Sequence, residues 1–540
     1  MVASTVGTGL KSDSLVIGGG LAGIVTALEL LKAGKQVVLL DRGAQQDFGG
    51  QAKEALGGMT FTGTPQQRRA GIDDSATLAY QDWIRYGMFE DEDVWPKAWA
   101  KTYVEQCVEE VYFWLRGQGL RFLPVITWGE RGMNEVGNSV PRYHLLWGGG
   151  YTLATRMIEL LTPYMDRLTL RFNQNVLGLT TEAGVVVGCH GITEPSGEAF
   201  EFRAETTVVA TGGVGGDLEL VRSLWPSEWG DAPDTLLTGA HQYSDGKLHQ
   251  QVEQIGGNVT HLSRMWNYAT GFHHPQPRKP NHGLALLPPR SAIWVDYQGK
   301  RIGPEPLMGA FDTRFTCEQV SRQPHGYSWS ILNRKVVEKE LMISGSEHNP
   351  ALRDRKLFTF LKENILGNKR VFNYLANEVG DVCTAATPEQ LAEKMNQITG
   401  EGDVDAAALR ATIAAYDGEI DRGVDQLTDP QLKRIKLLRE WKGDRPKVCN
   451  FQKIGDPAAG PLMAIRQFIL CRKSLGGIQT DLEGRVLKAD GSAIEGLYAV
   501  GEASGFGGGG SNGVRSLEGT FLAGCILTGR LTGKAIGNAG

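Results

Sequence analysis

The sequence predicts an α/β fold in which a Rossmann-like dinucleotide-binding domain is formed by both ends of the chain, with an α+β domain inserted between them. Three observations lead to this prediction. Residues 14–41, SLVIGGGLAGIVTALELLKAGKQVVLLD, read as a buried strand, a glycine turn, an amphipathic helix and a second strand. Residues 207–210 form another apolar run that ends in a glycine pair. Glycine-rich strand and turn sequence then returns after Gly476.

The glycines of the first turn each have a physical role. Gly18, Gly20 and Gly23 follow GxGxxG spacing. The first allows a tight turn, the second lets a pyrophosphate touch the backbone, and the third lets helix and strand pack closely. Asp41 ends the second strand and is placed to accept hydrogen bonds from a ribose, which favours FAD or NAD over NADP. The alternative is a strand–helix–strand turn without a ligand.

Composition and charge limit the class of protein. The chain of 540 residues is expected to form two or three domains, and 41% hydrophobic with 22% charged residues is typical of a globular protein. A net charge of −5 gives no reason to expect nucleic acid or an anionic membrane as a partner. The seven cysteines form no CxxC or CxxCH motif, which argues against a disulfide framework, a metal site and an attached haem, and fits a reducing cytoplasm. We expect neither a signal peptide nor an integral membrane segment.

The remaining elements are expected in a fixed order. The pattern predicts helices over residues 64–118, 152–161 and 242–257, a β-meander over 168–179, 184–192 and 200–204, and a strand over 207–210. A stretch rich in proline and histidine, near residues 271–289, marks the crossing into the inserted domain. That domain is expected to begin with a strand at 291–295 and to be largely helical afterwards. The predicted boundaries are 1–285 and 458–540 for the dinucleotide-binding domain and 286–457 for the inserted domain.

Four motifs in one order resemble those of a known flavoprotein group. They are GGGLAG from Gly18, ATGG from Ala210, SAIWVDYQGKR from Ser291 and GGIQTDLEGRVL from Gly476. The resemblance is to the superfamily of fumarate reductase and succinate dehydrogenase flavoproteins and 3-ketosteroid Δ1-dehydrogenase, and within it to a bacterial branch of FAD-binding dehydrogenases. It implies FAD as cofactor, a Rossmann-like FAD-binding domain (GR2-type) and an inserted α+β capping domain that closes over the isoalloxazine.

The same resemblance implies a set of cofactor-binding residues. They are Gly18, Gly20, Leu21, Ala22, Gly23, Asp41, Arg42, Gly49, Gly50, Gln51, Gly57, Gly58, Ala210, Thr211, Gly212, Gly477, Gly501, Glu502, Gly510, Ser516 and Leu517. Succinate dehydrogenases carry a histidine for covalent flavin attachment where Gln51 stands here, so we expect FAD to be held noncovalently. The histidine that fumarate reductases carry before the glycine pair is also replaced, and Arg472 or Lys473 is expected at the flavin N1–O2 edge.

Chemistry beside a flavin requires a donor to a carbonyl oxygen and an acid or base for the α-proton. Tyr143 and His144 are the acid/base candidates. Arg515 is a candidate clamp on a carbonyl or carboxylate, with a salt bridge to Glu518 as its alternative. Arg314 resembles the arginine that delivers a proton in fumarate reductases. The candidate substrate-binding residues are Arg142, Trp147 and Tyr268, and Trp266 is a further candidate for the pocket wall; core packing is the alternative for the aromatic ones.

The predicted function is an FAD-dependent dehydrogenase or reductase acting on CH–CH groups. It would introduce or reduce a C=C bond α,β to a carbonyl, with a steroid or cyclic ketone favoured as substrate. One alternative is a fumarate-reductase-like enzyme acting on a small unsaturated dicarboxylate. Another is a flavin-bearing electron-transfer or binding module. A small-molecule substrate and an unidentified electron acceptor or donor are the expected partners, in the cytoplasm, and the oligomeric state stays open.

Overall fold

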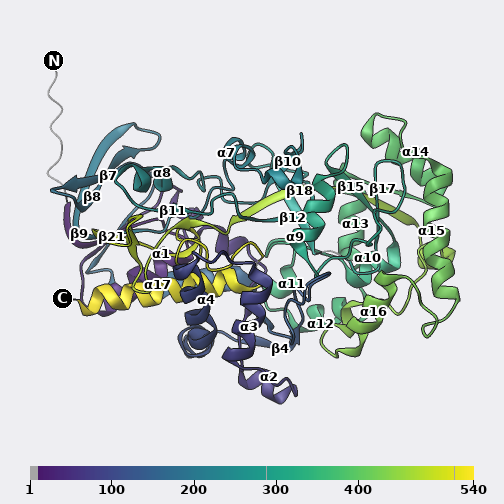
Figure 1. The fold of residues 1–540 in the computed structure, drawn as a ribbon, viewed down its shortest axis with the longest axis horizontal. Coiled ribbons are helices and arrows are strands. Elements are labelled where there is room, and N and C mark those ends of the chain that lie inside the picture. The colour runs from purple at the N-terminus through teal and green to yellow at the C-terminus, as the bar shows by residue number, and fades with distance from the viewer. Residues whose placement is uncertain (1–9, 288, 516, 540) are drawn as a thin grey trace.

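The computed structural model describes residues 10–287, 289–515 and 517–539. The predicted cofactor residue Ser516 therefore lies outside the described residues. The molecule is elongated and has two lobes, each containing an eight-stranded sheet (Figure 1). We call the lobe that contains the first strand the first lobe, and the other the second lobe.

The first lobe contains the predicted strand–turn–helix–strand unit. Its sheet has the order β20-β21-β9-β1-β2-β6, and every neighbouring pair from β21 to β6 is parallel. The apolar runs predicted as buried strands belong to these central strands, which are covered on both faces. The strands are β1 (Leu10–Ile17), β2 (Val37–Leu40), β6 (Leu168–Arg171), β7 (Gln174–Glu182), β8 (Val185–Thr193), β9 (Glu198–Val209), β20 (Arg485–Leu487) and β21 (Ala493–Ala499).

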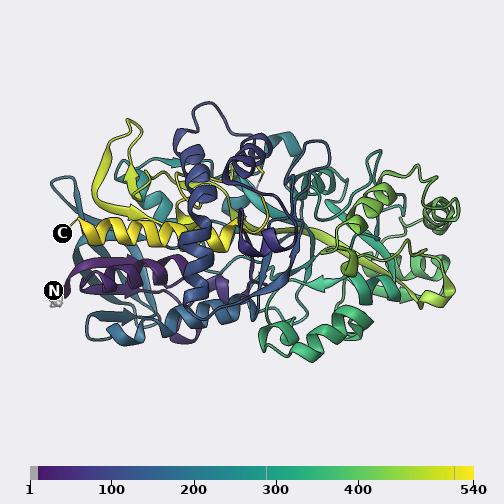
Figure 2. The same ribbon diagram turned by 90° about the horizontal axis from the view of Figure 1, so that it is seen from below.

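Two helices from opposite ends of the sequence lie side by side in the first lobe (Figure 2). They are α1 (Leu21–Lys32) and α17 (Thr520–Asn538). Glycines on α17 permit this close approach, because a Cβ at Gly529 would lie 2.8 Å from the carbonyl oxygen of Ala22. The other helices before residue 260 are α2 (Pro65–Arg69), α3 (Ala76–Gly87), α4 (Val94–Gln106), α5 (Trp114–Gly117), α6 (Gly149–Glu159), α7 (Leu218–Ser223) and α8 (Lys247–Gln254).

The predicted β-meander is wrong in one respect. Residues 168–171 form β6, which pairs with β2 in the parallel sheet, and β7 begins a separate antiparallel hairpin at Gln174. The break falls at Asn173, whose φ of +58° is incompatible with a continuous strand. The expected strands at 200–204 and 207–210 are one continuous strand, β9.

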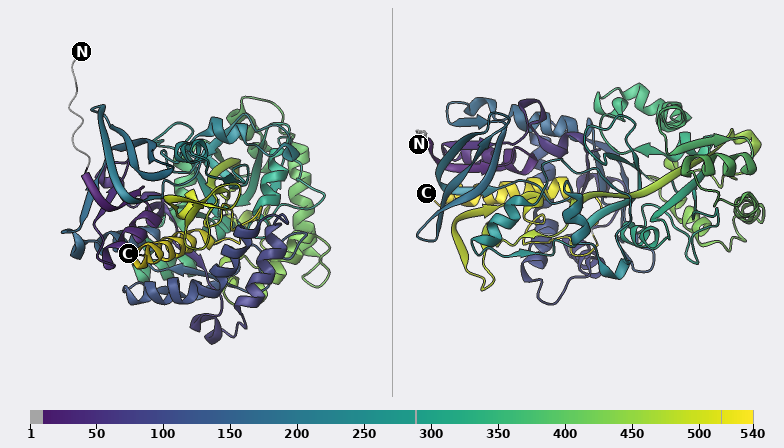
Figure 3. Two further views of the ribbon diagram at one scale, coloured as in Figure 1. Left: turned by 60° about the vertical axis from the view of Figure 1, so that its left-hand side comes forward. Right: turned by 90° about the horizontal axis from the view of Figure 1, so that it is seen from above.

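The second lobe is built on a long strand that the sequence pattern did not predict. This strand, β18 (Leu462–Ser474), pairs with β10, β12, β15 and β17 and extends from one lobe toward the other (Figure 3). Its sheet therefore includes strands from outside residues 286–457, and the predicted domain boundaries stay a prediction. The other strands are β10 (Leu236–Thr238), β12 (Met265–His273), β13 (Gly283–Leu287), β14 (Ile293–Val295), β15 (Tyr327–Asn333), β16 (Met342–Ile343) and β17 (Val382–Ala385).

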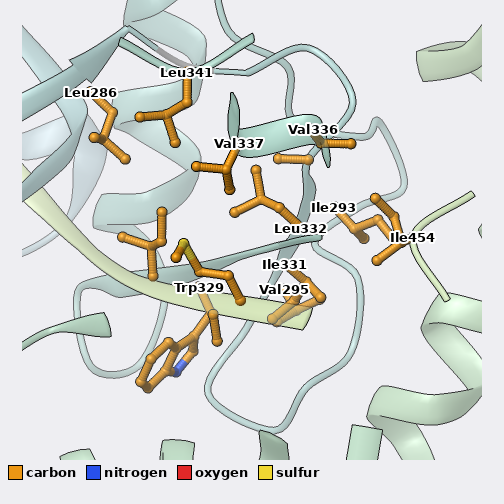
Figure 4. Packing of buried hydrophobic residues seen from close by; sticks show 14 of the residues in the cluster. Leu286, Ile293, Val295, Trp329, Ile331, Leu332, Val336, Val337, Leu341 and Ile454 are labelled. Atoms are coloured by element: carbon orange, nitrogen blue, oxygen red, sulfur yellow. The ribbon is translucent and has the colours of Figure 1, made fainter. Parts of the chain in front are cut away.

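Helices pack around this sheet and enclose an apolar core. Ile331 and Leu332 on β15 point to its two faces, and Val336 and Val337 follow on the next helix (Figure 4). The helices are α9 (Thr313–Ser321), α10 (Arg334–Glu340), α11 (Pro350–Arg353), α12 (Leu357–Leu366), α13 (Lys369–Glu378), α14 (Pro388–Thr399), α15 (Ala406–Asp421) and α16 (Pro430–Glu440). Among the described residues, no helix combines the length and the apolar character needed to cross a membrane.

Three short strands bring the first lobe's glycine pairs next to a tyrosine. They are β3 (Gly58–Thr60), β4 (Phe122–Thr127) and β5 (Tyr143–Leu146), and β5 is the middle strand. The register pairs Thr60 with Tyr143 and Gly58 with Leu145. Tyr143 is thereby fixed beside the segment that carries Gly57 and Gly58.

Candidate functional site

One cavity extends from the glycine turn of the first lobe to residues of the second lobe. At one end it is lined by the turn after β1, by the turn after β9 and by Asp41. At the other end it is lined by Tyr143, Tyr268 and Glu518, with Leu287 and Ser344 from the second lobe. The glycine-turn end lies at the carboxyl ends of parallel strands, which is where open α/β sheets bind ligands.

The glycine turn exposes its backbone to this cavity. A Cβ at Gly18, whose φ is +114°, would collide with the carbonyl oxygen of Ala210, and one at Gly23 would collide with that of Gly18. A Cβ at Gly20 would meet no atom within 4 Å. Gly20 is also the N-cap of α1, which has no side-chain cap and no acidic residue in its first turn. The N–H groups in the first turn of this 12-residue helix are therefore open to a phosphate.

Carboxylates and a cation lie at the glycine-turn end of the cavity. Asp41 accepts hydrogen bonds from the backbone N–H of Gly19 at 2.7 Å and of Gly43 at 2.6 Å. Burial raises the pKa of Asp41. Arg42 forms ion pairs with Glu194 and Asp245, and its guanidinium lies 4.5 Å from the ring of Tyr243. Sequence reasoning missed further lining residues, among them Gln174, Asn175, His241, Tyr243, Ser244 and Lys247.

Most of the predicted cofactor residues line the cavity. Those that do are Gly18, Gly20, Leu21, Ala22, Asp41, Arg42, Gly50, Gln51, Gly57, Gly58, Ala210, Thr211, Gly212 and Glu502. The described ones that do not line it are Gly23, Gly49, Gly477, Gly501, Gly510 and Leu517. Gly23 packs α1 against β1, and Gly49 donates its N–H to the carbonyl of Gly19. Gly23 and Gly49 therefore support the shape of the glycine turn without lining the cavity.

Tyr143 and Tyr268 face the opposite end of the cavity. The Tyr143 hydroxyl lies directly against Gly58, where any side chain would collide with it. Burial, followed by the charge of Glu518, raises the pKa of the Tyr143 hydroxyl. Burial and Glu518 also raise the pKa of Tyr268, and Tyr143 contributes to that shift because it is close. Both phenols are therefore protonated at neutral pH.

A polar network holds Tyr268 in place. The hydroxyl of Tyr268 donates to Glu518 Oε2 at 3.2 Å, and Trp266 Nε1 donates to the same oxygen at 2.9 Å. Lys473 Nζ donates to the Tyr268 hydroxyl at 3.3 Å and lies 4.1 Å from the centre of the Phe521 ring. Burial lowers the pKa of Lys473 to about 8. Tyr268 thus lies between a carboxylate and an ammonium group.

The end of β18 supplies one further polar side chain to the site and bonds a second through its backbone. Arg472 lines the cavity and donates to the carbonyl of Gly239, which also accepts from Gln51 Nε2 at 2.9 Å. Glu502 accepts a hydrogen bond from the Ser474 N–H at 2.9 Å, and burial raises the pKa of Glu502 to about 7. Arg472 and Lys473 both line the cavity wall, and the position of either one at the flavin N1–O2 edge stays a prediction.

Arg142 and His144 lie on the other side of β5 from the cavity. Side chains alternate along a strand, so Tyr143 and its two neighbours face opposite ways. Arg142 is 1% exposed and forms ion pairs with Asp74 at 2.9 Å and Asp82 at 2.6 Å. His144 donates from Nδ1 to the carbonyl of Arg142 and accepts at Nε2 from Thr64. Burial lowers the pKa of His144 to about 4. Neither side chain lines the cavity.

The remaining candidates also have partners away from the cavity. Arg515 pairs with Asp312 at 3.3 Å, rather than with Glu518, and its guanidinium lies 5.4 Å from the ring of Tyr86.

Arg314 pairs with Glu228 at 3.1 Å and lies over Trp229. Trp147 packs edge-on against Phe360, with ring centres 5.3 Å apart. The structure therefore brings Tyr143, Tyr268 and Lys473 together but places Arg142, His144, Trp147, Arg314 and Arg515 elsewhere.

Sequence reasoning missed Glu518 as a site residue. The carboxylate and the Tyr268 hydroxyl that it accepts from are 250 residues apart in sequence. Two strands, a loop and the start of a helix that are far apart in sequence come together around this carboxylate. No local spacing of residues indicates that they do. The sequence signal that could have found it is the motif LEGTFL, residues 517–522, which contains Glu518.

Known proteins share this sequence and architecture. A KsdD-like steroid dehydrogenase of Mycobacterium tuberculosis is 40% identical over 99% of this chain and 97% of its own length. A 3-ketosteroid Δ1-dehydrogenase from Sterolibacterium denitrificans has a similar fold, with a TM-score of 0.72 at 16% identity, covering 98% of this chain and 100% of that one.

A flavocytochrome c3 fumarate reductase also has a similar fold, with a TM-score of 0.70 at 21% identity over 98% of this chain and 79% of that one. Residues 13–522 match the family described as the FAD binding domain. The open glycine turn, the acid after β2 and a cavity lined by both fit a dinucleotide. The chain therefore belongs to the FAD binding domain family of flavoproteins.

Proposed function

We propose that the protein is an FAD-dependent dehydrogenase that introduces a C=C bond α,β to the ketone of a 3-ketosteroid or a related cyclic ketone. The observation that carries this proposal is the pair of phenols, Tyr143 and Tyr268, in a wall that also contains the apolar residues Leu287, Phe506, Phe521 and Leu522 and the polar residues Ser344, Lys473 and Glu518. An apolar wall with few polar groups suits a fused ring system with one carbonyl. The 40% identical relative is named as a steroid dehydrogenase.

A small dicarboxylate fits the same end of the cavity less well. A dianion needs guanidinium partners to replace its hydration. The three arginines that the sequence nominated, Arg142, Arg314 and Arg515, are each paired with a carboxylate and do not line the cavity. The cations of β18 that do line it, Arg472 and Lys473, are bonded to the carbonyl of Gly239 and to the Tyr268 hydroxyl, which supports the ketone substrate over the fumarate-like alternative.

The contacts of the two phenols assign them different roles. Tyr143 has a hydroxyl held against Gly58 and is placed to donate to the ketone oxygen, which makes the α-proton more acidic. Tyr268 donates to Glu518 and accepts from Lys473, so it can take the α-proton while its own proton passes to Glu518. Bound FAD supplies the acceptor for the hydride that leaves the neighbouring carbon.

Two structural features are part of the proposal. The segment 286–457 would act as a capping domain that excludes water from the reaction, since Leu287 and Ser344 already contribute to the cavity wall. FAD would be held noncovalently, because Gln51 lines the cavity where a covalently linked flavin would need a histidine. Acid precipitation of the purified protein should then release all of the flavin into the supernatant.

Anaerobic titration of the FAD-loaded protein tests the function. Adding 4-androstene-3,17-dione should bleach the oxidised flavin, and turnover with an artificial electron acceptor should give a product with two hydrogens fewer. Dye-reduced protein should not be reoxidised by fumarate at a comparable rate. Rapid reoxidation by fumarate, with no bleaching by any 3-ketosteroid, would support the dicarboxylate alternative instead.

A further inference from the structure

Helix α12 (Leu357–Leu366) presents its apolar face to the outside of the molecule. None of its ten residues is buried. Helical spacing places four apolar side chains on one face. Their exposed fractions are 50% for Leu357, 88% for Phe358, 44% for Leu361 and 67% for Ile365. An exposed apolar face of this kind marks a surface that something covers.

The inner face of α12 is less apolar than the outer one. Phe360 packs against Trp147, and Asn364 is bonded within the helix through its amide and to Lys339 through its carbonyl. Glu363 is the third partly buried residue on this side. A helix folded only to fill the protein core would have the opposite arrangement. Its apolar face therefore serves contact with another phase or molecule.

Basic side chains border this apolar face. Residues 353–370 contain six Lys or Arg and two acidic residues, a net charge of +4 in a chain whose net charge is −5. Within the described part of the chain, Arg355, Lys362 and Lys369 have no carboxylate within ion-pair distance. An apolar face with a basic border is complementary to an anionic lipid surface. A second copy of the same face would bring like charges together.

The position of α12 connects this face to the cavity. Ser344 lines the cavity, and the short stretch from Ser344 leads through α11 to α12. Along that stretch, Ser346 donates to the carbonyls of Lys53 and Glu54, in the turn beside the cavity residues Gly50 to Ala52. Figure 1 shows α12 on the lower side of the molecule, where the two lobes meet.

We propose that α12 and its basic border form a docking surface for an anionic lipid bilayer. The helix would lie flat in the headgroup region with Phe358 and Ile365 inserted, since ten residues are too few to span a bilayer. The reason for such docking rests on the proposed function, because a lipophilic ketone partitions into membranes and would enter the cavity from there. The lipid contact itself does not depend on turnover.

Vesicle flotation of the FAD-loaded full-length protein tests the docking surface. The protein should float with phosphatidylcholine vesicles that contain phosphatidylglycerol, and less with phosphatidylcholine alone or at high salt. F358S/I365S should lower the bound fraction at least fivefold, whereas V94S/M165S, which replaces apolar residues that are 65% and 52% exposed elsewhere, should not. K362E/K369E should also lower it, with K101E/K488E as the matched control.

Three results would overturn the lipid surface. They are no flotation of the wild type, equal flotation of wild type and F358S/I365S, and a dimer in solution that the same double substitution abolishes. Turnover of a detergent-solubilised ketosteroid separates this inference from the proposed function. If the wild type floats but oxidises no ketosteroid, the lipid surface is supported and the proposed substrate is wrong. If it oxidises the ketosteroid but does not float, the proposed substrate is supported and the lipid surface is wrong.

Discussion

The two ends of the cavity are built in different ways. The glycine-turn end is organised by the backbone of one continuous stretch, residues 14–41, in which Gly18 and Gly23 let main chains approach, and side chains from residues 174–175 and 241–247 complete its wall. The phenol end consists of side chains from β5, β12, β18 and the start of α17, which meet only in the folded protein. The first end is a local structure, and the second is a product of the tertiary fold.

This difference has a functional consequence. The glycine-turn end would bind a phosphate through N–H groups and a helix terminus, which depend little on the surrounding side chains. The phenol end depends on Tyr143, Tyr268, Lys473 and Glu518 being placed by separate elements, so each substitution there should change chemistry rather than folding. The predictions below separate those two kinds of effect.

The largest effect is expected from Gly23→Ala. The added Cβ would collide with the carbonyl oxygen of Gly18, so α1 would have to move away from β1. We expect the apoprotein of this variant to unfold at a clearly lower temperature than the wild-type apoprotein. We also expect the purified variant to retain no FAD. Gly20→Ala is the matched control, because its Cβ meets no protein atom within 4 Å. That variant should keep the apoprotein melting temperature and weaken FAD binding about tenfold or more, since the methyl occupies the phosphate position. Equal melting temperatures for both apoproteins would contradict the assigned roles.

Removing the phenols should abolish most chemistry and leave the flavin in place. Tyr268→Phe should lower kcat about 10²–10⁴-fold, the usual contribution of a positioned acid or base. Tyr143→Phe should lower it about 10²-fold through loss of a donor to the carbonyl oxygen. Stopped-flow measurement of flavin reduction, at full FAD occupancy, checks both values. Unchanged reduction rates in both variants would place the reacting end of the flavin elsewhere.

Lys473 should give the reaction a pH dependence of its own. The ammonium form, present below a pKa of about 8, donates to Tyr268 and stabilises negative charge on it. The rate of flavin reduction should therefore fall as the pH rises through about 8, where Lys473 loses its proton. In Lys473→Met the transition should vanish and the plateau rate should fall about 10–100-fold, the value of one charge-assisted hydrogen bond. A pH profile of flavin reduction that is identical in wild type and variant would exclude this role.

The smallest effect on chemistry is expected at His144. Its side chain is fully buried on the far side of β5 and hydrogen-bonded to Thr64, and its low pKa of about 4 keeps it neutral at working pH. His144→Gln should cost about 1–3 kcal/mol of stability through the disturbed buried hydrogen bonds. The rate per FAD-loaded molecule should change less than twofold. A loss comparable to that of Tyr143→Phe would make His144 part of the reaction after all.

The two ends of the cavity also differ in how much of them the sequence could predict. The spacing of Gly18, Gly20 and Gly23 and the acid at Asp41 sufficed to predict β1, α1 and β2, because these features are local. Tyr143 and His144 are adjacent and looked equivalent, and only the pairing of β5 with β3 and β4 decides which one faces the cavity.

Longer-range features were missed for the same reason. β18 is the central strand of the second lobe, yet its 13 residues carry no turn signal that identifies it. The net charge of −5 gave no sign of the local +4 around α12, because a total conceals its distribution. For Arg515 the sequence suggests a clamp on the substrate, or a salt bridge to its neighbour Glu518, whereas its partner in the fold is Asp312.

A structure of the FAD-loaded protein with a bound 3-ketosteroid tests the central claim most directly. The account predicts that the adenosine ribose lies at Asp41, that the isoalloxazine lies at the other end of the cavity, and that the steroid ketone contacts the hydroxyls of Tyr143 and Tyr268. A flavin ring at the Asp41 end, or a steroid bound outside the wall formed by these two tyrosines, would contradict it.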